Sequence, residues 1–257
     1  LLAMSSLGLP WWVGVLLAMV VCTVLGVIIE GLAYKPLRAA PSLAVLITAI
    51  GVSYFLQNAA QLIWGASPMS YTPIVSGSLQ LFGEQLSISY VSLLTIVVCA
   101  VIMVGLTLFT SKSKMGKAMR ACSEDKGAAQ LMGINVNRTI SLTFAIGSAL
   151  AAIAGVLLCS FNTSLMPTTG SMPGIKAFTA AVFGGIGSIP GAVIGAFIIG
   201  ICENIIKGLD TLLVAYGVIP TGLGLSTFAD AFTFVLLIII LVFKPTGLFG
   251  EKATDKV

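Results

Sequence analysis

Few side chains in this sequence could bind or transform a solute, because only 9% of its 257 residues are charged and none is histidine. It therefore has no imidazole to serve as a general base, a proton relay or a metal ligand. Glu203 and Asp230 are the only acids that fall within the long apolar stretches. We expect both to lie near the outer ends of helices, where they extend toward water or pair with Lys207. Carriers driven by protons or sodium ions usually have deeper, paired acids, so these positions argue against that class.

A set of uncharged polar residues recurs in one apolar stretch at i, i+3, i+4 and i+7: Tyr54, Gln57, Asn58 and Gln61. This spacing places them on one face of a helix. Contact of this polar face with lipid would be unfavourable. The face therefore lines a solute path or hydrogen-bonds to neighbouring helices, where each bond contributes about 0.6 kcal/mol on average. The sequence favours neither interpretation.

A cluster of helix breakers interrupts another apolar stretch, "KAFTAAVFGGIGSIPGAVIGAF", at residues 176–197. In a continuous helix each glycine would cost about 1 kcal/mol and an interior proline about 3 kcal/mol. Irregular backbone at membrane depth is tolerated only where it is buried in protein or lines a wet cavity. We therefore interpret the break as a turn beside a translocation pathway, formed by Gly184, Gly185, Gly187, Ser188 and Pro190.

The helix that follows the break has two interpretations. In the first, Ser188 caps it, Pro190 opens it, and its N-terminal amides face the pathway, where they could attract a carboxylate. In the second, Gly187, Gly191 and Gly195 form a ridge of small residues that lets two helices pack closely. Packing by itself accounts for the spacing of these three glycines, whereas the pathway better explains the break.

The composition places these residues in a membrane. The chain is 58% hydrophobic with a mean hydropathy of +1.09, whereas soluble domains are about 45 to 50% apolar and about 25% charged. Its net charge of +4 could indicate binding to nucleic acid. The basic residues are, however, spread over short loops and form no continuous basic face for such a partner. The five cysteines follow no metal or redox spacing. We expect no metal and no cofactor to be bound by this chain.

Apolar segments near the length of about 20 residues that a membrane span needs occur repeatedly along the chain. We predict spans at Trp11 to Ile29, Leu43 to Leu62, Tyr90 to Phe109, Thr139 to Phe161 and Thr227 to Phe243, with a sixth apolar segment, Gly191 to Ile206, after the break.

The loop charges predict the orientation of these spans. Eleven of the thirteen basic residues fall between spans one and two, between three and four, or after the last, which the positive-inside rule places in the cytoplasm with the C-terminus. Residues 63–89 contain no Lys or Arg and are expected outside, as are residues 162–175. Lys176 to Ile206 must then leave and return on the same side, either as a re-entrant hairpin or as two full crossings.

The most polar segment is "SKSKMGKAMRACSEDKGAAQLMGINVNRTISLTF", residues 111–144. It contains a long polar stretch that is compatible with a helix, then the small residues Ala128 and Ala129, then Gly133 as a helix C-cap. A short helix under the membrane is a docking surface for a partner. A solvated basic loop is the alternative, and charge alone does not distinguish the two.

Together with "AYKPLRAAPSLAVLITAIGVSYFLQN" (residues 33–58) and "GIKAFTAAVFGGIGSIPGAVIGA" (residues 174–196), this segment resembles the permease subunits of bacterial branched-chain amino acid ABC transporters. The pattern Glu-Ala-Ala-x-x-x-Gly of ABC permeases reads here Gly-Ala-Ala-Gln-Leu-Met-Gly from Gly127 to Gly133. Gly127 departs from it, and Glu124 lies about one turn earlier, so the role of the glutamate at the ATPase interface is either kept by Glu124 or absent. The resemblance implies a cytoplasmic coupling segment, residues 111–138, that contacts an ATPase through Glu124, Ala128, Ala129 and Gly133.

The resemblance implies an all-α, polytopic transmembrane bundle with a broken or re-entrant helix pair, similar to type II ABC importer permeases. It implies one permease domain over residues 1–257, which we expect to be truncated at its N-terminus. The implied partners are a second, similar permease chain, two cytoplasmic ATPase subunits, a periplasmic or extracellular substrate-binding protein and the lipid of a bacterial cytoplasmic membrane.

The sequence has no Gly-x-x-x-x-Gly-Lys-[Ser/Thr] phosphate loop, so ATP is expected to be hydrolysed by a partner and the chain is not expected to be an enzyme. The resemblance leaves open other amino acids, urea or short amides as the solute. An ATP-independent channel or secondary carrier is the alternative from another class. An intramembrane enzyme would need Ser/Lys or Asp pairs, and none is convincingly spaced.

Overall fold

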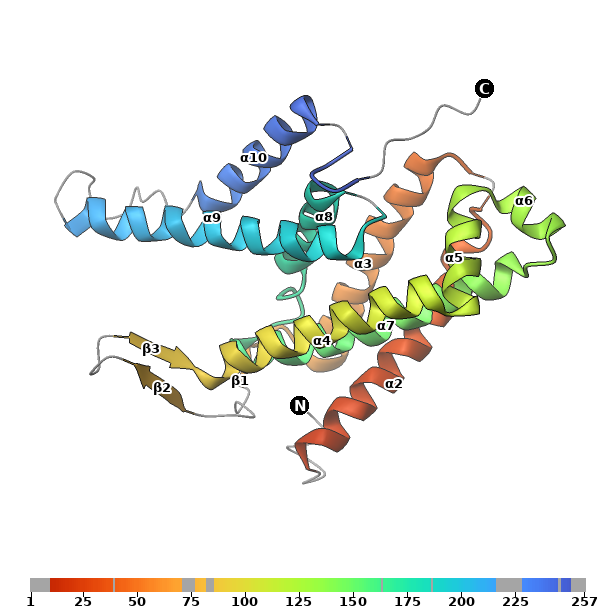
Figure 1. Cartoon of the computed structure of the whole chain (residues 1–257). Coiled ribbons are helices and arrows are strands. Elements are labelled where there is room, and N and C mark those ends of the chain that lie inside the picture. Colours follow the sequence, from red (N-terminus) through yellow and green to blue (C-terminus); the bar gives the residue numbers. More distant parts are fainter. Residues whose placement is uncertain are drawn as a thin grey trace. The chain divides into compact units, whose positions relative to one another are not determined.

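The computed structural model describes residues 10–38, 40–70, 77–81, 86–162, 164–185, 187–215, 228–244 and 246–250. The chain divides into two compact units, Leu1–Gly170 and Ser171–Val257, and each is described by itself. Helices form nearly all of the regular structure in both units (Figure 1), which confirms the predicted all-α class. The single domain predicted over residues 1–257 stays a prediction.

The first unit holds six α-helices among its described residues: α2 (Trp11–Ile29), α3 (Ser42–Trp64), α4 (Tyr90–Lys112), α5 (Lys114–Glu124), α6 (Lys126–Leu131) and α7 (Val136–Phe161). A π-helical turn, η1 (Glu30–Tyr34), extends α2 without a break. Glu30 therefore belongs to a span that was predicted to end at Ile29. The most extensive contact between helices of the first unit is that of α2 with α7.

Two short antiparallel strand pairs, which were not predicted, accompany these helices. β1 (Met69–Ser70) pairs with β4 (Ser164–Leu165), and β2 (Ser78–Leu81) pairs with β3 (Leu86–Ser89). All four strands lie in segments that the sequence analysis took as outer loops. Ser89 ends β3 and caps α4, because its side chain accepts a hydrogen bond from the Val91 amide at 3.3 Å.

The second unit contains α8 (Ser171–Gly184), α9 (Ile189–Ala215) and α10 (Ala229–Phe243). α10 contacts α9 and runs obliquely to it in Figure 1. Its core is formed by Ala180, Phe183 and Ile199, against which residues of α10 and Leu248 pack. The predicted span Gly191 to Ile206 is part of a helix of 27 residues. Thr227, predicted to begin the last span, lies outside the described residues.

Among the residues that the structure describes, five helices are long and apolar enough to cross a membrane: Trp11–Tyr34, Leu43–Trp64, Tyr90–Lys112, Val136–Phe161 and Ile189–Val214. α10 is a shorter apolar helix of 15 residues. Large apolar side chains cover the outside of the spans, for example Leu62, which is 89% exposed. Water would disfavour so much exposed apolar surface. The chain is therefore a multi-pass membrane protein, as the composition predicted.

Candidate functional site

The cytoplasmic coupling segment predicted at residues 111–138 forms two helices. The Ser113 hydroxyl accepts a hydrogen bond from the Gly116 amide at 2.8 Å and so caps α5. Asp125 ends α5 in an extended conformation, and its carboxylate accepts the Gly127 amide at 2.7 Å and the Ala128 amide at 3.1 Å. The helix-compatible stretch is therefore helical but divided at Asp125, because an aspartate at this position caps a new helix.

The end of α6 has the predicted glycine cap. Gly133 has φ +81°, the left-handed conformation that glycine adopts without steric cost. The Ile134 amide donates to the Ala129 carbonyl at 3.0 Å, and the Gly133 amide donates to the Gln130 carbonyl at 3.0 Å. This pair of bonds is the Schellman motif, which fixes the direction in which the chain leaves α6.

The side chain of Ala129 is buried inside this subunit, which corrects its predicted role as a contact with a partner. It is 3% exposed and forms a small core with Cys122 and Val136. Cys122 is buried in α5. This core joins α5, α6 and the first turn of α7, so Ala129 holds the segment together.

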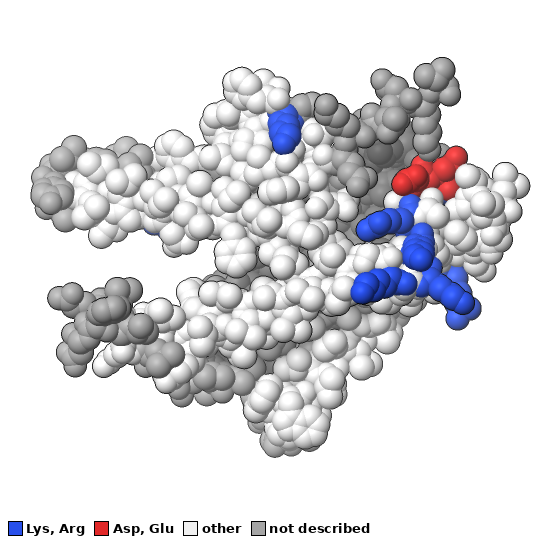
Figure 2. Space-filling view, in the orientation of Figure 1, with Lys and Arg blue, Asp and Glu red and all other residues white. Residues whose placement is uncertain are grey.

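The outer surface of α6 is formed by other residues. Leu131 is 90% exposed and Met132 is 84% exposed, and Glu124, Ala128 and Gly133 are exposed beside them. Basic side chains gather over the end of α4 and over α5 in Figure 2: Lys112, Lys114, Lys117 and Arg120. The segment thus presents an apolar tip next to both acidic and basic side chains (Figure 2).

The turn between α8 and α9 packs against residues 246–250. The Leu248 amide donates to the Phe183 carbonyl at 2.9 Å, and the Phe249 amide donates to the Gly184 carbonyl at 2.9 Å. A Cβ atom on Gly185 would overlap the backbone of Gly250. Residues 246–250 thus explain Gly185, whereas a Cβ atom on Gly184 would overlap the backbone of Gly191 in α9. Neither glycine requires a pathway for its explanation.

The start of α9 follows the first of the two interpretations in its local geometry. The Ser188 hydroxyl accepts the Gly191 amide at 3.1 Å, so Ser188 caps α9 as predicted. Pro190 is the second residue of the helix. Gly187 and Pro190 are exposed, and a role for the exposed side of this turn in a pathway stays a prediction.

Close packing of α8 against α9 accounts for two of the three ridge glycines. A Cβ atom on Gly191 would meet the Gly184 carbonyl, and one on Gly195 would meet the Ala180 carbonyl. A Cβ atom on Gly187 would face open space, but this residue takes φ +102°. Gly187 is therefore required by the turn and is not part of the ridge.

The polar face of α3 makes its hydrogen bonds within its own helix. Gln57 Nε2 donates to Ser53 Oγ at 3.1 Å, and Asn58 Nδ2 donates to the Tyr54 carbonyl at 2.8 Å. Tyr54 is 61% exposed, and Gln61 is half-buried. The choice between a solute path and a neighbouring helix as the partner of this face stays open.

A lysine joins the two acids that the sequence analysis singled out. Lys176 Nζ of α8 lies 2.9 Å from Glu203 of α9 and 2.7 Å from Asp230 of α10. Lys207 Nζ also lies 2.6 Å from Glu203, as predicted. Two carboxylates at hydrogen-bond distance offset the cost of removing the Lys176 ammonium from water. Lys176 therefore ties three helices together.

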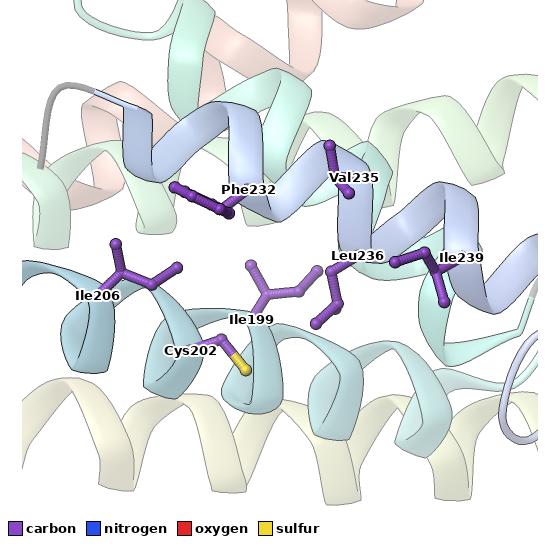
Figure 3. Close-up of a pocket in the computed structure, with 7 residues that line it drawn as sticks. All are labelled: Ile199, Cys202, Ile206, Phe232, Val235, Leu236 and Ile239. Carbon is purple, nitrogen blue, oxygen red and sulfur yellow. The ribbon is translucent and has the colours of Figure 1, made fainter. Parts of the chain in front are cut away.

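A small apolar cavity of about 190 Å³ lies between α9 and α10. Figure 3 shows side chains of the two helices facing one another across it. Its lining is formed by Ile199, Cys202, Ile206, Phe232, Val235, Leu236 and Ile239. The cavity is smaller than the roughly 300 to 1,000 Å³ of pockets for drug-sized ligands. It matches an aliphatic group and offers no partner for an ammonium or a carboxylate.

Comparison with known proteins identifies the family of this chain. The model of the family described as "Branched-chain amino acid transport system / permease component" matches residues 1–242. The chain belongs to this permease family. No solved structure matches it.

Several curated proteins are similar to this permease. The high-affinity branched-chain amino acid transport system permease protein BraD of Pseudomonas aeruginosa is 43% identical over 244 residues, 93% of this chain and 75% of its own length. LivH of Escherichia coli, which has the same descriptive name, is 43% identical over 93% of this chain and 74% of its own length. The xylose transport system permease protein XylH of Escherichia coli is 33% identical over 45% of this chain and 31% of its own length.

The sequence analysis missed two ionic contacts of this permease. Lys176 was not considered as a partner of Glu203 and Asp230, and Glu30 was placed outside the first span. Glu30 is 2% exposed and is paired with Arg38. One signal was present, because "EGLAY" continues the apolar helix for another turn and places an acid in it.

Proposed function

We propose that this chain is one of two permease subunits of an ATP-driven importer that carries branched-chain amino acids across the bacterial cytoplasmic membrane. The observation that carries the proposal is the 43% identity, over 93% of the chain, to proteins named as high-affinity branched-chain amino acid permeases. A xylose permease is similar over only 45% of the chain. The longer and stronger similarity therefore favours an amino acid over a sugar.

ATP hydrolysis in this proposal takes place on two separate subunits, because the chain has no phosphate loop. The ATPase docks on the tip of α6, where Leu131 and Met132 are 90% and 84% exposed. Exposed apolar residues next to a polar rim are typical of protein interfaces. Glu124, Ala128 and Gly133 border this tip, while Ala129 supports it from inside.

The proposed orientation has residues 111–138 and the C-terminus in the cytoplasm. Lys176 and Lys207 are the basic residues that fall outside the cytoplasmic loops, and Glu203 pairs with both. The pairing offsets the cost of holding these lysines close to the membrane, and it is compatible with the orientation predicted from the loop charges.

α8 and α10 cover the same depth of the second unit. The start of α8 is tied to the start of α10 by Lys176 and Asp230, and the end of α8 is bonded to Leu248, just beyond α10. The two helices have 14 and 15 residues, or about 21 and 22 Å at 1.5 Å per residue. Both lengths are shorter than the roughly 30 Å hydrocarbon core of a bilayer, so the re-entrant hairpin and the two full crossings both stay predictions.

Reconstitution tests the proposal. The permease is placed in lipid vesicles with its companion permease, the two ATPases and the binding protein, and uptake of labelled leucine, isoleucine, valine, urea and xylose is measured with and without ATP. We expect ATP-dependent uptake of the three branched amino acids above the other two solutes. Uptake at the same rate without ATPase subunits would identify a channel or carrier instead, and preference for urea or xylose would change the solute.

A further inference from the structure

A buried carboxylate lies where α2 ends. Glu30 is 2% exposed and stands at the start of η1, the π-helical turn that extends α2. Its carboxylate accepts hydrogen bonds from Arg38 and from the Ser141 hydroxyl at 2.7 Å. A charge taken out of water in this way is costly unless it is paired and hydrogen-bonded. Glu30 has both kinds of partner.

The partners of Glu30 connect α2 to the start of α7. Ser141 lies in the second turn of α7, and Arg38 also donates to Asn137 Oδ1, in its first turn. The Nε of Arg38 is buried without a hydrogen-bond partner among the described residues, so its two terminal nitrogens hold the guanidinium. We call Glu30, Arg38, Asn137 and Ser141 the polar clamp.

Packing around the polar clamp is close. Gly26 lies against Ser148, where a Cβ atom would overlap the serine side chain. The rings of Tyr34 and Phe144 contact each other with centroids 5.0 Å apart. A joint with directional, charge-assisted bonds and tight packing has little freedom to slide.

The start of α7 also contacts α6, the helix on which the ATPase is proposed to dock. Val136, the first residue of α7, belongs to the core that Ala129 and Cys122 form under α5 and α6. The Schellman bonds from Ile134 to Ala129 and from Gly133 to Gln130 fix the short link between α6 and α7. A displacement of α6 must therefore carry the first turns of α7 with it.

We propose that the polar clamp is the coupling joint of this subunit, which transfers a displacement of α6 through the start of α7 to the span α2. The inference rests on the proposed function, because it requires an ATPase that moves α6. Asn137, Ser141 and Arg38 act as positioning residues and touch no solute. π-helical turns such as η1 occur often at functional sites, which agrees with this location.

The test removes the hydrogen bonds that join α7 to Glu30 and Arg38, and it keeps the Glu30–Arg38 pair. Asn137→Ala with Ser141→Ala removes the two contacts from α7 and leaves no buried charge alone. Thr143→Ala is the matched control, because its hydroxyl donates to the Thr139 carbonyl of its own helix at 2.9 Å. ATP hydrolysis and leucine uptake are measured together in vesicles that hold the full complex.

We expect the double variant to assemble and hydrolyse ATP like the unmodified complex but to move about fivefold fewer leucine molecules per ATP, within the range of mutations that modulate coupling. Ser141→Thr, which keeps the hydroxyl donor, should retain the original ratio, as should the control Thr143→Ala. An unchanged ratio in the double variant would overturn the inference. So would a loss of assembly that Thr143→Ala shares, because the effect would then be structural. Absence of ATP-dependent uptake in the unmodified complex would instead reject the proposed function, and the inference with it.

Discussion

Lys176 of α8 and Asp230 of α10 form an ion pair, with Nζ 2.7 Å from Oδ1. The same ammonium contacts Glu203 of α9 at 2.9 Å. One lysine thus joins α8, α9 and α10 at the end where α8 and α10 begin. The first prediction concerns this contact.

Lys176→Met should destabilise the second unit, because it leaves two acids facing each other with only Lys207 to neutralise them. Removing one partner of a buried pair costs about 3 to 5 kcal/mol. The Lys176 side chain is 27% exposed and that of Asp230 is 40% exposed, so we expect about 2 kcal/mol after solvent screening. Thermal unfolding of the purified permease in detergent measures the loss.

Lys207→Met is the matched control for Lys176→Met. Its side chain is 50% exposed, and it pairs with Glu203 at i,i+4, a geometry that contributes about 0.3 to 0.5 kcal/mol. The unfolding temperature should hardly change. Equal losses in the two variants would show that Lys176 does not join the helices.

Gly185→Ala should destabilise the permease more than Gly187→Ala. Both glycines have positive φ, 107° and 102°, and a side chain there costs about 1 to 2 kcal/mol. Only Gly185 also lies against the backbone of Phe249 and Gly250. The midpoint of thermal unfolding should therefore fall clearly further for Gly185→Ala. The same midpoint in both variants would mean that residues 246–250 do not pack on the break.

Leu131→Asp combined with Met132→Asp should weaken ATPase binding at least about tenfold, since a loss of about 1.4 kcal/mol at an interface has that effect. Both side chains are exposed, so the stability of the isolated permease should be preserved. Pull-down of the ATPase subunits and the unfolding temperature are measured together. Full ATPase binding by this variant would remove α6 as the docking element.

Ala129→Arg is the contrasting variant for this surface. Ala129 is 3% exposed in the core with Cys122 and Val136, so an arginine there should disrupt α5 and α6 and lower the unfolding temperature. Its loss of ATPase binding would follow from misfolding. A stable Ala129→Arg variant would contradict the observed packing.

Cysteine labelling checks the proposed orientation. Ser164→Cys should react with an impermeant reagent from outside, and Ser123→Cys, at an exposed position of α5, should react from the cytoplasm. Native Cys122 is only 7% exposed and should react slowly from either side. Ser76, which the sequence analysis would also place outside, lies beyond the described residues. Outside labelling of Ser123→Cys would reverse the orientation.

The sequence by itself determined the features that depend on neighbouring residues. Apolar length predicted the spans, since a helix needs no distant partner to satisfy its backbone in lipid. Ser188 and Gly133 were predicted as helix boundaries because capping acts over three or four residues. The same local chemistry explains the one boundary missed there, since Asp125 is a good N-cap and starts α6.

Only the tertiary structure decided which residues far apart in the chain meet. Arg38 and Asn137 are separated by 99 positions, and Lys176 reaches Asp230 on another helix. Ala129 was expected to face a partner but lies in a core with Cys122 and Val136. The spacing of residues in one helix gives the face on which they lie. It does not say what packs on that face, because the choice depends on how whole helices bury their apolar surfaces and pair their charges.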